Sequence, residues 1–167
     1  MKEASFSAIF RKQAREYFDT LSRPVHQYLI QDSYRSGKKP YDAYMVIDKR
    51  FYSIEFKAEK TASLRLDRFS DHQVEYAKEV TKAGGISLFI VLFETQKESF
   101  LGLMRYRDYL RAVAEFGKDK ATKVDALLEL GFLKRIDKVN KSSSSRAKIW
   151  DFAKIWSTDA RAVEKRA

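Results

Sequence analysis

One run near the middle of the chain limits the possible folds more than any other feature. Residues 86–93, ISLFIVLF, show no alternation of polar and apolar side chains. A strand of this kind is buried on both faces and lies in the centre of a sheet that is covered on both sides. Helical apolar spacing before and after the run supplies elements for that cover. The sequence therefore predicts a mixed α/β fold with a central mixed sheet flanked by helices.

Apolar spacing and turn residues place the other elements around this strand. The predicted helices cover residues 5–21, 69–83, 105–116, 124–130 and 147–158. Further strands are predicted at 27–35, twice within 40–57, and at 100–104. The two strands of 40–57 are joined by a tight turn at Asp48-Lys49-Arg50. We interpret 36–40 as a turn, 58–68 as a polar loop and 138–148, with its four consecutive serines, as a basic linker.

Length and composition favour one domain whose partner is a polyanion. The 167 residues, 44% of them hydrophobic, suffice for a single core, which we expect over about 5–137. The net charge of +10 makes nucleic acid the first candidate partner. The chain has no cysteine and two histidines, which excludes disulfides and thiolate catalysis and supplies a zinc site poorly. No apolar run approaches a membrane span, so we expect a cytoplasmic protein that does not bind membranes.

Three charged residues within 40–57 form the candidate site. Glu55 and Lys57 are two residues apart on one strand and therefore project from the same face, while Asp42 opens the neighbouring strand. Two carboxylates beside an ammonium group can hold Mg²⁺, which prefers few carboxylates and keeps several waters. Such a site can polarise a phosphodiester and activate a water. The solvated face of an ordinary hairpin carries the same residue types, so both interpretations stay open on these residues alone.

Other polar residues stand near this hairpin in the predicted elements. Gln73 interrupts an apolar stripe, predicted to face the core, that also contains Phe69, Tyr76, Ala77 and Val80. A buried amide needs partners, so Gln73 bonds either to backbone or to a polar site. Glu16, on the first helix, is a further candidate carboxylate. Candidate phosphate contacts, which an ordinary surface would also supply, are Lys60, Thr61, Ser63, Arg65 and Arg68 in the loop and Arg11 and Arg15 on the first helix.

The order of these features resembles the PD-(D/E)XK nuclease superfamily, with its restriction-endonuclease-like fold. Within it, the sequence is most similar to the RecU-type Holliday-junction resolvases. Three segments carry the resemblance: YDAY (41–44), FYSIEFKAEK (51–60) and FSDHQVEYAKEVTKAGGISLFIV (69–91). The stretch GFLKRIDKV (131–139) is similar to the family's C-terminal segment.

The resemblance implies a role for each matching residue. Asp42 and Glu55 would be ligands of Mg²⁺ or Mn²⁺, Lys57 the catalytic lysine, and Gln73 a residue lining the site. Glu16, or alternatively Glu3, would be the helix carboxylate. The implied activity is metal-dependent cleavage of four-way DNA junctions by paired nicks, carried out by a homodimer in recombination and repair.

Two departures from the family pattern leave other activities open. The family's Pro-Asp pair is Pro40-Tyr41-Asp42 in this chain. The family also carries a stalk between the early strands, whereas residues 24–41 leave room for one strand and a turn. The alternatives are a related nuclease acting on duplex or flap DNA, and a non-catalytic basic DNA-binding accessory protein of recombination.

Overall fold

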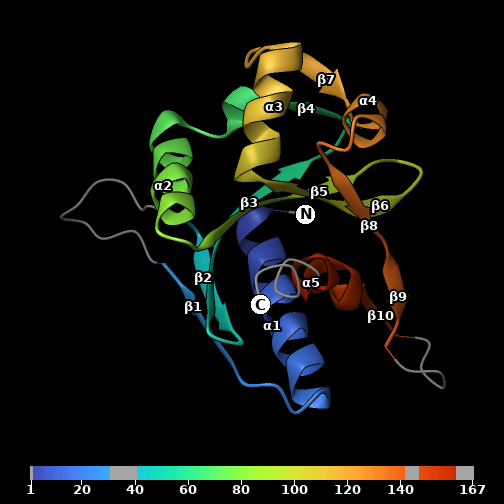
Figure 1. Ribbon diagram of the computed structural model, residues 1–167. Helices are drawn as coiled ribbons and strands as arrows, with labels where there is room; N and C mark the ends of the chain where they lie inside the picture. The colour runs from blue at the N-terminus through green and yellow to red at the C-terminus, as the bar shows by residue number, and fades with distance from the viewer. Residues whose placement is uncertain (1, 31–40, 142–146, 161–167) are drawn as a thin grey trace.

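The computed structural model describes residues 2–30, 41–141 and 147–160, and within them a central sheet between two layers of helices (Figure 1). The helices are α1 (Glu3–Thr20), α2 (Asp71–Lys82), α3 (Tyr106–Phe116), α4 (Val124–Glu129), α5 (Phe152–Ala160) and the 3-10 turn η1 (Leu66–Arg68). The strands are β1 (Val25–Leu29), β2 (Ala43–Ile47), β3 (Arg50–Glu59), β4 (Ser63–Arg65), β5 (Ile86–Glu94), β6 (Ser99–Arg105), β7 (Ala121–Lys123), β8 (Lys134–Ile136), β9 (Lys138–Asn140) and β10 (Lys148–Trp150).

The main sheet has six strands in the order β1-β2-β3-β5-β6-β8. β3 and β5 pair in parallel, with α2 as the crossover between them, and the other pairs are antiparallel. The predicted buried strand, β5, lies in the interior of this sheet between β3 and β6. The prediction of a mixed fold with a central mixed sheet flanked by helices is confirmed.

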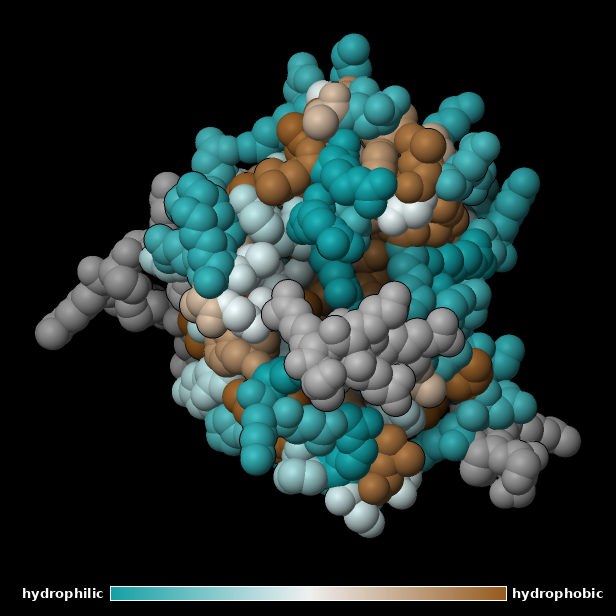
Figure 2. Space-filling model, in the orientation of Figure 1, coloured by the Kyte–Doolittle hydropathy of each residue, from teal (hydrophilic) through white to brown (hydrophobic). Residues whose placement is uncertain are grey.

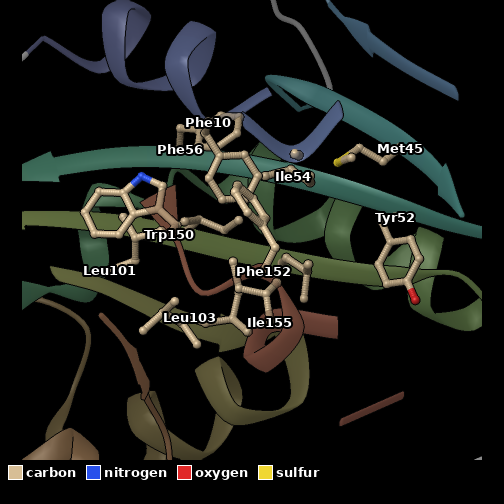
Figure 3. Close-up of a cluster of buried hydrophobic side chains, with 14 of the residues drawn as sticks. Phe10, Met45, Tyr52, Ile54, Phe56, Leu101, Leu103, Trp150, Phe152 and Ile155 are labelled. Carbon is tan, nitrogen blue, oxygen red and sulfur yellow. The ribbon is translucent and has the colours of Figure 1, made fainter. Parts of the chain in front are cut away.

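Each face of the sheet has its own hydrophobic core, because side chains alternate along every strand. On β3, Ile54 and Phe56 face the core built with α1 and α5, where Phe56 contacts Phe6 and Phe10 edge-on with centroid distances of 5.3 and 5.4 Å (Figure 3). The opposite face carries a second core with α2, α3 and α4, around Phe69 and Phe89. Glu55 and Lys57 of β3 belong to this second face.

A two-residue turn joins β2 to β3 and fixes their register. Ile47 pairs with Arg50, and the two residues between them, Asp48 and Lys49, both have positive φ, 49° and 64°. Positive φ at both central residues is the geometry of a type I′ turn, whose twist suits antiparallel strands. Arg23 forms an ion pair with Asp48 and ties the chain after α1 to this turn. The predicted tight hairpin is confirmed.

Several boundaries differ from those expected. The predicted loop 58–68 is wrong, because β3 continues to Glu59 and is followed by β4 and η1. The predicted linker 138–148 begins with β9 and ends at the first residue of β10, which pairs with β9, and 142–146 lie outside the described residues. The last helix begins at Phe152 rather than at 147. β4 pairs with β7, far along the chain, so its local composition does not reveal it, and the basic, serine-rich composition around β9 and β10 hid their pairing with each other.

Two further differences concern the sequence before β2 and the exposed side of α2. The first sheet strand ends at Leu29, and the rest of the predicted strand and the turn at 36–40 lie outside the described residues. On α2, Ala77 is buried, as expected, whereas Tyr76 is 38% exposed and does not belong to the core.

Polar residues dominate the face of the molecule seen in Figure 2. No helix within the described ranges is long and apolar enough to span a bilayer.

Candidate active site

The hairpin of β2 and β3 brings Asp42 against β3 close to Glu55. Asp42 immediately precedes β2, and its N–H donates at 3.1 Å to the carbonyl of Ile54, the residue that pairs with Ala43. The Phe56 N–H donates to Asp42 Oδ2 at 2.8 Å, which fixes the carboxylate against β3. Phe56 is the residue after Glu55, so the Asp42 carboxylate is fixed beside the part of β3 that carries Glu55.

Glu55 and Lys57 form a buried ion pair on the face of β3 that is opposite the α1 core. Their side chains are 4% and 10% exposed, and Lys57 Nζ lies 2.5 Å from Glu55 Oε1. The ammonium also lies 5.8 Å from the centroid of the Phe69 ring, within the range of a cation–π interaction. A pair this deeply buried costs desolvation free energy that simple stability does not demand, which makes it a functional candidate.

Gln73 connects α2 to the same carboxylate. Its Nε2 donates to Glu55 Oε1, and its own Oε1 accepts the Ser70 N–H at 3.0 Å. The second bond belongs to a capping box at the start of α2, in which an N-terminal Ser and the residue three positions later satisfy each other's backbone donors. Gln73 thus bonds both to backbone and to a polar site, the two options left open by the sequence.

Glu16 does not join this group. Its Oε2 accepts from Lys141 Nζ at 2.8 Å on the outer side of α1, and this bond holds the pKa of Glu16 below its ordinary value. Among the residues that the structure describes, no three acidic, histidine or cysteine side chains gather into a metal site. Glu3, the alternative, accepts from Arg68 at 2.9 Å.

Sequence reasoning missed Glu59, which lies four residues after Glu55 and on the same face of β3. Its Oε1 is 3.2 Å from Arg68 Nε, and Arg68 joins it to Glu3 at the start of α1. Burial raises the pKa of Glu59, against the lowering effect of Arg68. Extending the period of two from Glu55 and Lys57 by one step would have found this residue, but the expected strand ended too early.

The predicted phosphate contacts fall into two groups on opposite sides of the sheet. Lys60, Thr61 and Ser63 lie in and after the turn that follows β3, and the hydroxyls of Thr61 and Ser63 are 3.1 Å apart. Arg65 and Arg68 are paired with carboxylates, Arg65 with Asp67. Arg11 and Arg15 belong to α1, which covers the other face. Burial, followed by the charge of Arg15, lowers the pKa of Arg11.

The donor set fits a hard divalent cation rather than zinc. Asp42 and Glu55 offer carboxylate oxygens from adjacent strands, and no histidine or cysteine of the described chain joins them. Mg²⁺ and Mn²⁺ take oxygen ligands and complete their shells with water, so two carboxylates suffice to hold one. The neighbouring ammonium of Lys57 supplies a second positive group beside the same oxygens.

Comparisons with known proteins identify the family of the chain. A family model described as "Recombination protein U" (RecU) matches residues 6–140. Two relatives, each a Holliday junction resolvase RecU, come from Streptococcus suis strains 05ZYH33 and 98HAH33. Each is 41% identical over 61 residues, which is 35% of this chain and only 29% of the relative's own length.

One solved structure is similar in outline. Hjc from Archaeoglobus fulgidus, a Holliday junction resolvase from an archaeal hyperthermophile, aligns with a TM-score of 0.46 and 13% identity over 72% of this chain and 90% of its own. The family assignment rests on the model match alone, which covers most of the chain and includes Asp42, Glu55, Lys57 and Gln73. The chain belongs to the RecU family.

Proposed function

We propose that this protein is a divalent-metal-dependent endonuclease that resolves four-way DNA junctions by paired nicks in recombination and repair. One observation carries the proposal: Glu55 Oε1 accepts hydrogen bonds from both Lys57 and Gln73, and the Asp42 carboxylate accepts the N–H of the next residue of β3, Phe56. Membership of the RecU family supports the substrate class, as does the name of the two relatives from Streptococcus suis.

Asp42 and Glu55 are the residues that would hold Mg²⁺ or Mn²⁺. When bound, the cation polarises the phosphodiester and lowers the pKa of a coordinated water. Asp42 is positioned for this role by the Phe56 N–H, which occupies Oδ2 at 2.8 Å. Glu55 is positioned by Gln73 from α2, so its carboxylate is fixed before substrate arrives.

Lys57 provides the positive charge that the reaction needs close to these carboxylates. The phosphorus is attacked by water in line with the leaving oxygen, and negative charge accumulates on the phosphoryl oxygens. A pre-positioned ammonium stabilises that charge, and it can also orient the attacking water. The side chain is only 10% exposed, which strengthens its electrostatic effect by excluding solvent.

The proposal extends to how the whole protein binds DNA and to its symmetry as a homodimer. A net charge of +10 attracts the phosphate backbone. Lys60, Thr61 and Ser63 follow the catalytic strand and are the most direct candidates for backbone contacts. A homodimer would present two sites to a four-way junction, whose arms are arranged symmetrically. The cytoplasm, where bacterial or phage DNA is accessible, is the proposed location.

A second candidate activity is cleavage of duplex or flap DNA by the same residues. The short interval between β1 and β2, residues 30–42, favours it, because the chain there is too short for a long family-type stalk. A non-catalytic DNA-binding accessory role is less compatible with a buried Glu55–Lys57 pair, which binding alone does not require.

A nicking assay separates these activities. Purified protein with Mg²⁺ is incubated with a four-way junction, a flap and a linear duplex of matched sequence, beside the Asp42→Asn variant. This variant keeps an oxygen to accept the Phe56 N–H but loses the charge, so cleavage should fall by roughly a hundredfold or more while DNA binding persists.

The pattern of products decides between the candidates. Symmetric nicks in the junction alone, absent in Asp42→Asn, support the resolvase. Equal cleavage of all three substrates keeps the nuclease and removes junction selectivity. Binding without cleavage by the unaltered protein, across Mg²⁺ and Mn²⁺, leaves the accessory protein and overturns the catalytic assignment.

A further inference from the structure

A row of aromatic rings crosses the outer strands of the sheet on the same face as the candidate active site. Tyr28 of β1, Tyr44 of β2 and Phe51 of β3 form this aromatic row. The Tyr28 and Tyr44 centroids are 6.0 Å apart with an interplanar angle of 29°, and those of Tyr44 and Phe51 are 5.6 Å apart at 24°. His26 Nε2 lies 3.2 Å from the Tyr44 hydroxyl and fixes that ring.

The register shows that the aromatic row shares its face with Glu55. Tyr28 pairs with Tyr44 and Tyr44 pairs with Ser53, while Glu55 is two residues after Ser53 on β3. Two residues along a strand span about 7 Å and neighbouring strands lie about 4.8 Å apart, so Tyr28, two strands from Glu55, lies roughly 12 Å from it across the same face. A base stacked on Tyr28 would therefore belong to a nucleotide close to the one whose phosphate lies at Glu55.

The outer end of the aromatic row is open. β1 is an edge strand of the sheet, and Tyr28 is 54% exposed, the largest exposure among the large hydrophobic side chains of the described residues. The other exposed large hydrophobic side chains belong to other elements or their ends: Ile9, Leu21, Tyr76, Leu110, Leu130 and Val139. The apolar area near Tyr28 is therefore small compared with the roughly 800 Å² per partner of a stable protein interface.

The exposed ring of Tyr28, which is stacked on Tyr44 and lies near the candidate phosphate site, is suited to bind a nucleobase. Every base has a π-face, so stacking on tyrosine is tolerant of sequence and requires only that the base has left its duplex neighbours. Such unstacked bases occur at branch points and not along an intact duplex. The positive net charge of the protein favours an anionic partner. Among anionic partners, a nucleic acid has flat rings that can stack on Tyr28, whereas an acidic protein surface has carboxylates.

We propose that the aromatic row is a binding site for an unstacked nucleobase close to the cleaved phosphate, with Tyr28 as the stacking surface. Tyr44 and Phe51 support Tyr28 from within the sheet, and His26 holds Tyr44. This inference rests on the proposed function and deepens it, because it gives the protein a means to select branched over linear DNA without touching a base edge.

The test measures binding in EDTA, so that it does not depend on cleavage. The probe is a four-way junction with 2-aminopurine, a fluorescent adenine analogue, at the branch point, and the reference is a linear duplex carrying the same analogue. Tyr28→Ala should weaken binding to the junction by roughly 5- to 150-fold, the range expected for loss of one aromatic–base stack, and leave duplex affinity unchanged. Tyr28→Phe keeps the ring and should bind as the unaltered protein does.

A matched control and a second readout complete the design. Leu110→Ala removes a side chain of similar exposure, 45%, from α3 and should change neither affinity. Stacking on Tyr28 should also change the 2-aminopurine fluorescence on binding, and Tyr28→Ala should abolish that change. Sedimentation of each variant reports its oligomeric state.

Each result has a distinct meaning. If Tyr28→Ala binds junction and duplex as tightly as the unaltered protein, the nucleobase site is wrong, whatever the cleavage assay shows. If the same variant changes the oligomeric state, the aromatic row is a contact between copies of the chain and the proposal is overturned. If the unaltered protein binds neither DNA, the proposed function itself fails.

Discussion

At the scale of single residues, β3 carries a third charged side chain in series with the Glu55–Lys57 pair. Glu59 follows Glu55 and Lys57 at the same spacing of two, but it contacts Arg68 instead of the pair. Arg68 also reaches Glu3, so one guanidinium lies between two carboxylates. Because Arg68 is engaged in ion pairs within the protein, Lys60 is the better candidate for contact with DNA.

The raised pKa of Glu59 predicts a pH dependence of stability. Burial disfavours the ionised form in the folded state, so between the ordinary value of 4.5 and the raised pKa the folded protein holds more protons than the unfolded chain. The free energy of unfolding must then decrease as pH rises through this interval. In Glu59→Gln, which cannot ionise, thermal unfolding from pH 4.5 to neutral pH should show a smaller decrease.

Glu115→Gln is the control for this measurement, because Glu115 is an exposed side chain on α3. It should follow the unaltered protein at every pH. If Glu59→Gln and the unaltered protein lose stability in parallel over the whole interval, Glu59 is not the group that carries the effect.

At the scale of elements, the contact of β5 and β6 with the segment after α4 depends on a glycine. A Cβ on Gly102 of β6 would lie 2.7 Å from a ring carbon of Phe93 and 2.9 Å from both terminal carbons of Leu133. These neighbours are buried, so they have little room to move. Glycine is therefore required here by packing, and not by backbone conformation.

Gly102→Ala should accordingly destabilise the protein by about 1–3 kcal/mol through overpacking. Leu133→Ala alone should cost about 2–5 kcal/mol, because it leaves a cavity. In the double variant the new methyl group occupies part of that cavity. The loss of stability in the double variant should therefore be smaller than the sum of the two single losses. Chemical denaturation of the four proteins measures this coupling, and strict additivity would contradict the packing explanation.

Elements with a long local pattern were predictable from sequence, and those made by distant partners were not. The continuous apolar run of β5 and the helical apolar spacing of α1 can each be recognised within the segment itself. By contrast, β4 has three residues and exists because Leu64 pairs with Thr122 of β7, far along the chain. The polar composition of that segment therefore indicated a loop.

The same distinction applies to the site. Glu55 and Lys57 were predictable because a spacing of two puts them on one face, and Gln73 because an amide interrupted an apolar stripe. The pairing of Arg68 with Glu3 joins residues 65 positions apart, and nothing near either residue indicates it. The position of Glu16 beside Lys141, 125 positions away, was hidden for the same reason.

At the scale of the whole molecule, positive charge is present on both sides of the sheet, yet the candidate catalytic groups occupy one side only. Lys60 follows β3 directly, whereas Arg15 is an exposed residue of α1, which covers the opposite face. If DNA contacts the side that carries Glu55, the two cations should differ in their effect on binding although their formal charges are equal.

Lys60→Ala should lower the affinity for duplex DNA and reduce the slope of log affinity against log salt concentration by about one. Arg15→Ala should leave both quantities unchanged. Titrations at several salt concentrations measure this difference. An equal loss in the two variants would show that DNA reaches the α1 side as well.

The strict alternation of faces along β2 and β3 also limits how the length of this chain can change during evolution. Residues added to the turn at Asp48 and Lys49 leave both strands in phase, so insertions of any length there preserve the chemistry. One residue inserted between Ser53 and Lys57 would exchange the charged and apolar sides of all that follows. Homologous sequences should therefore vary freely at the hairpin tip, but within these strands only changes of even length should survive.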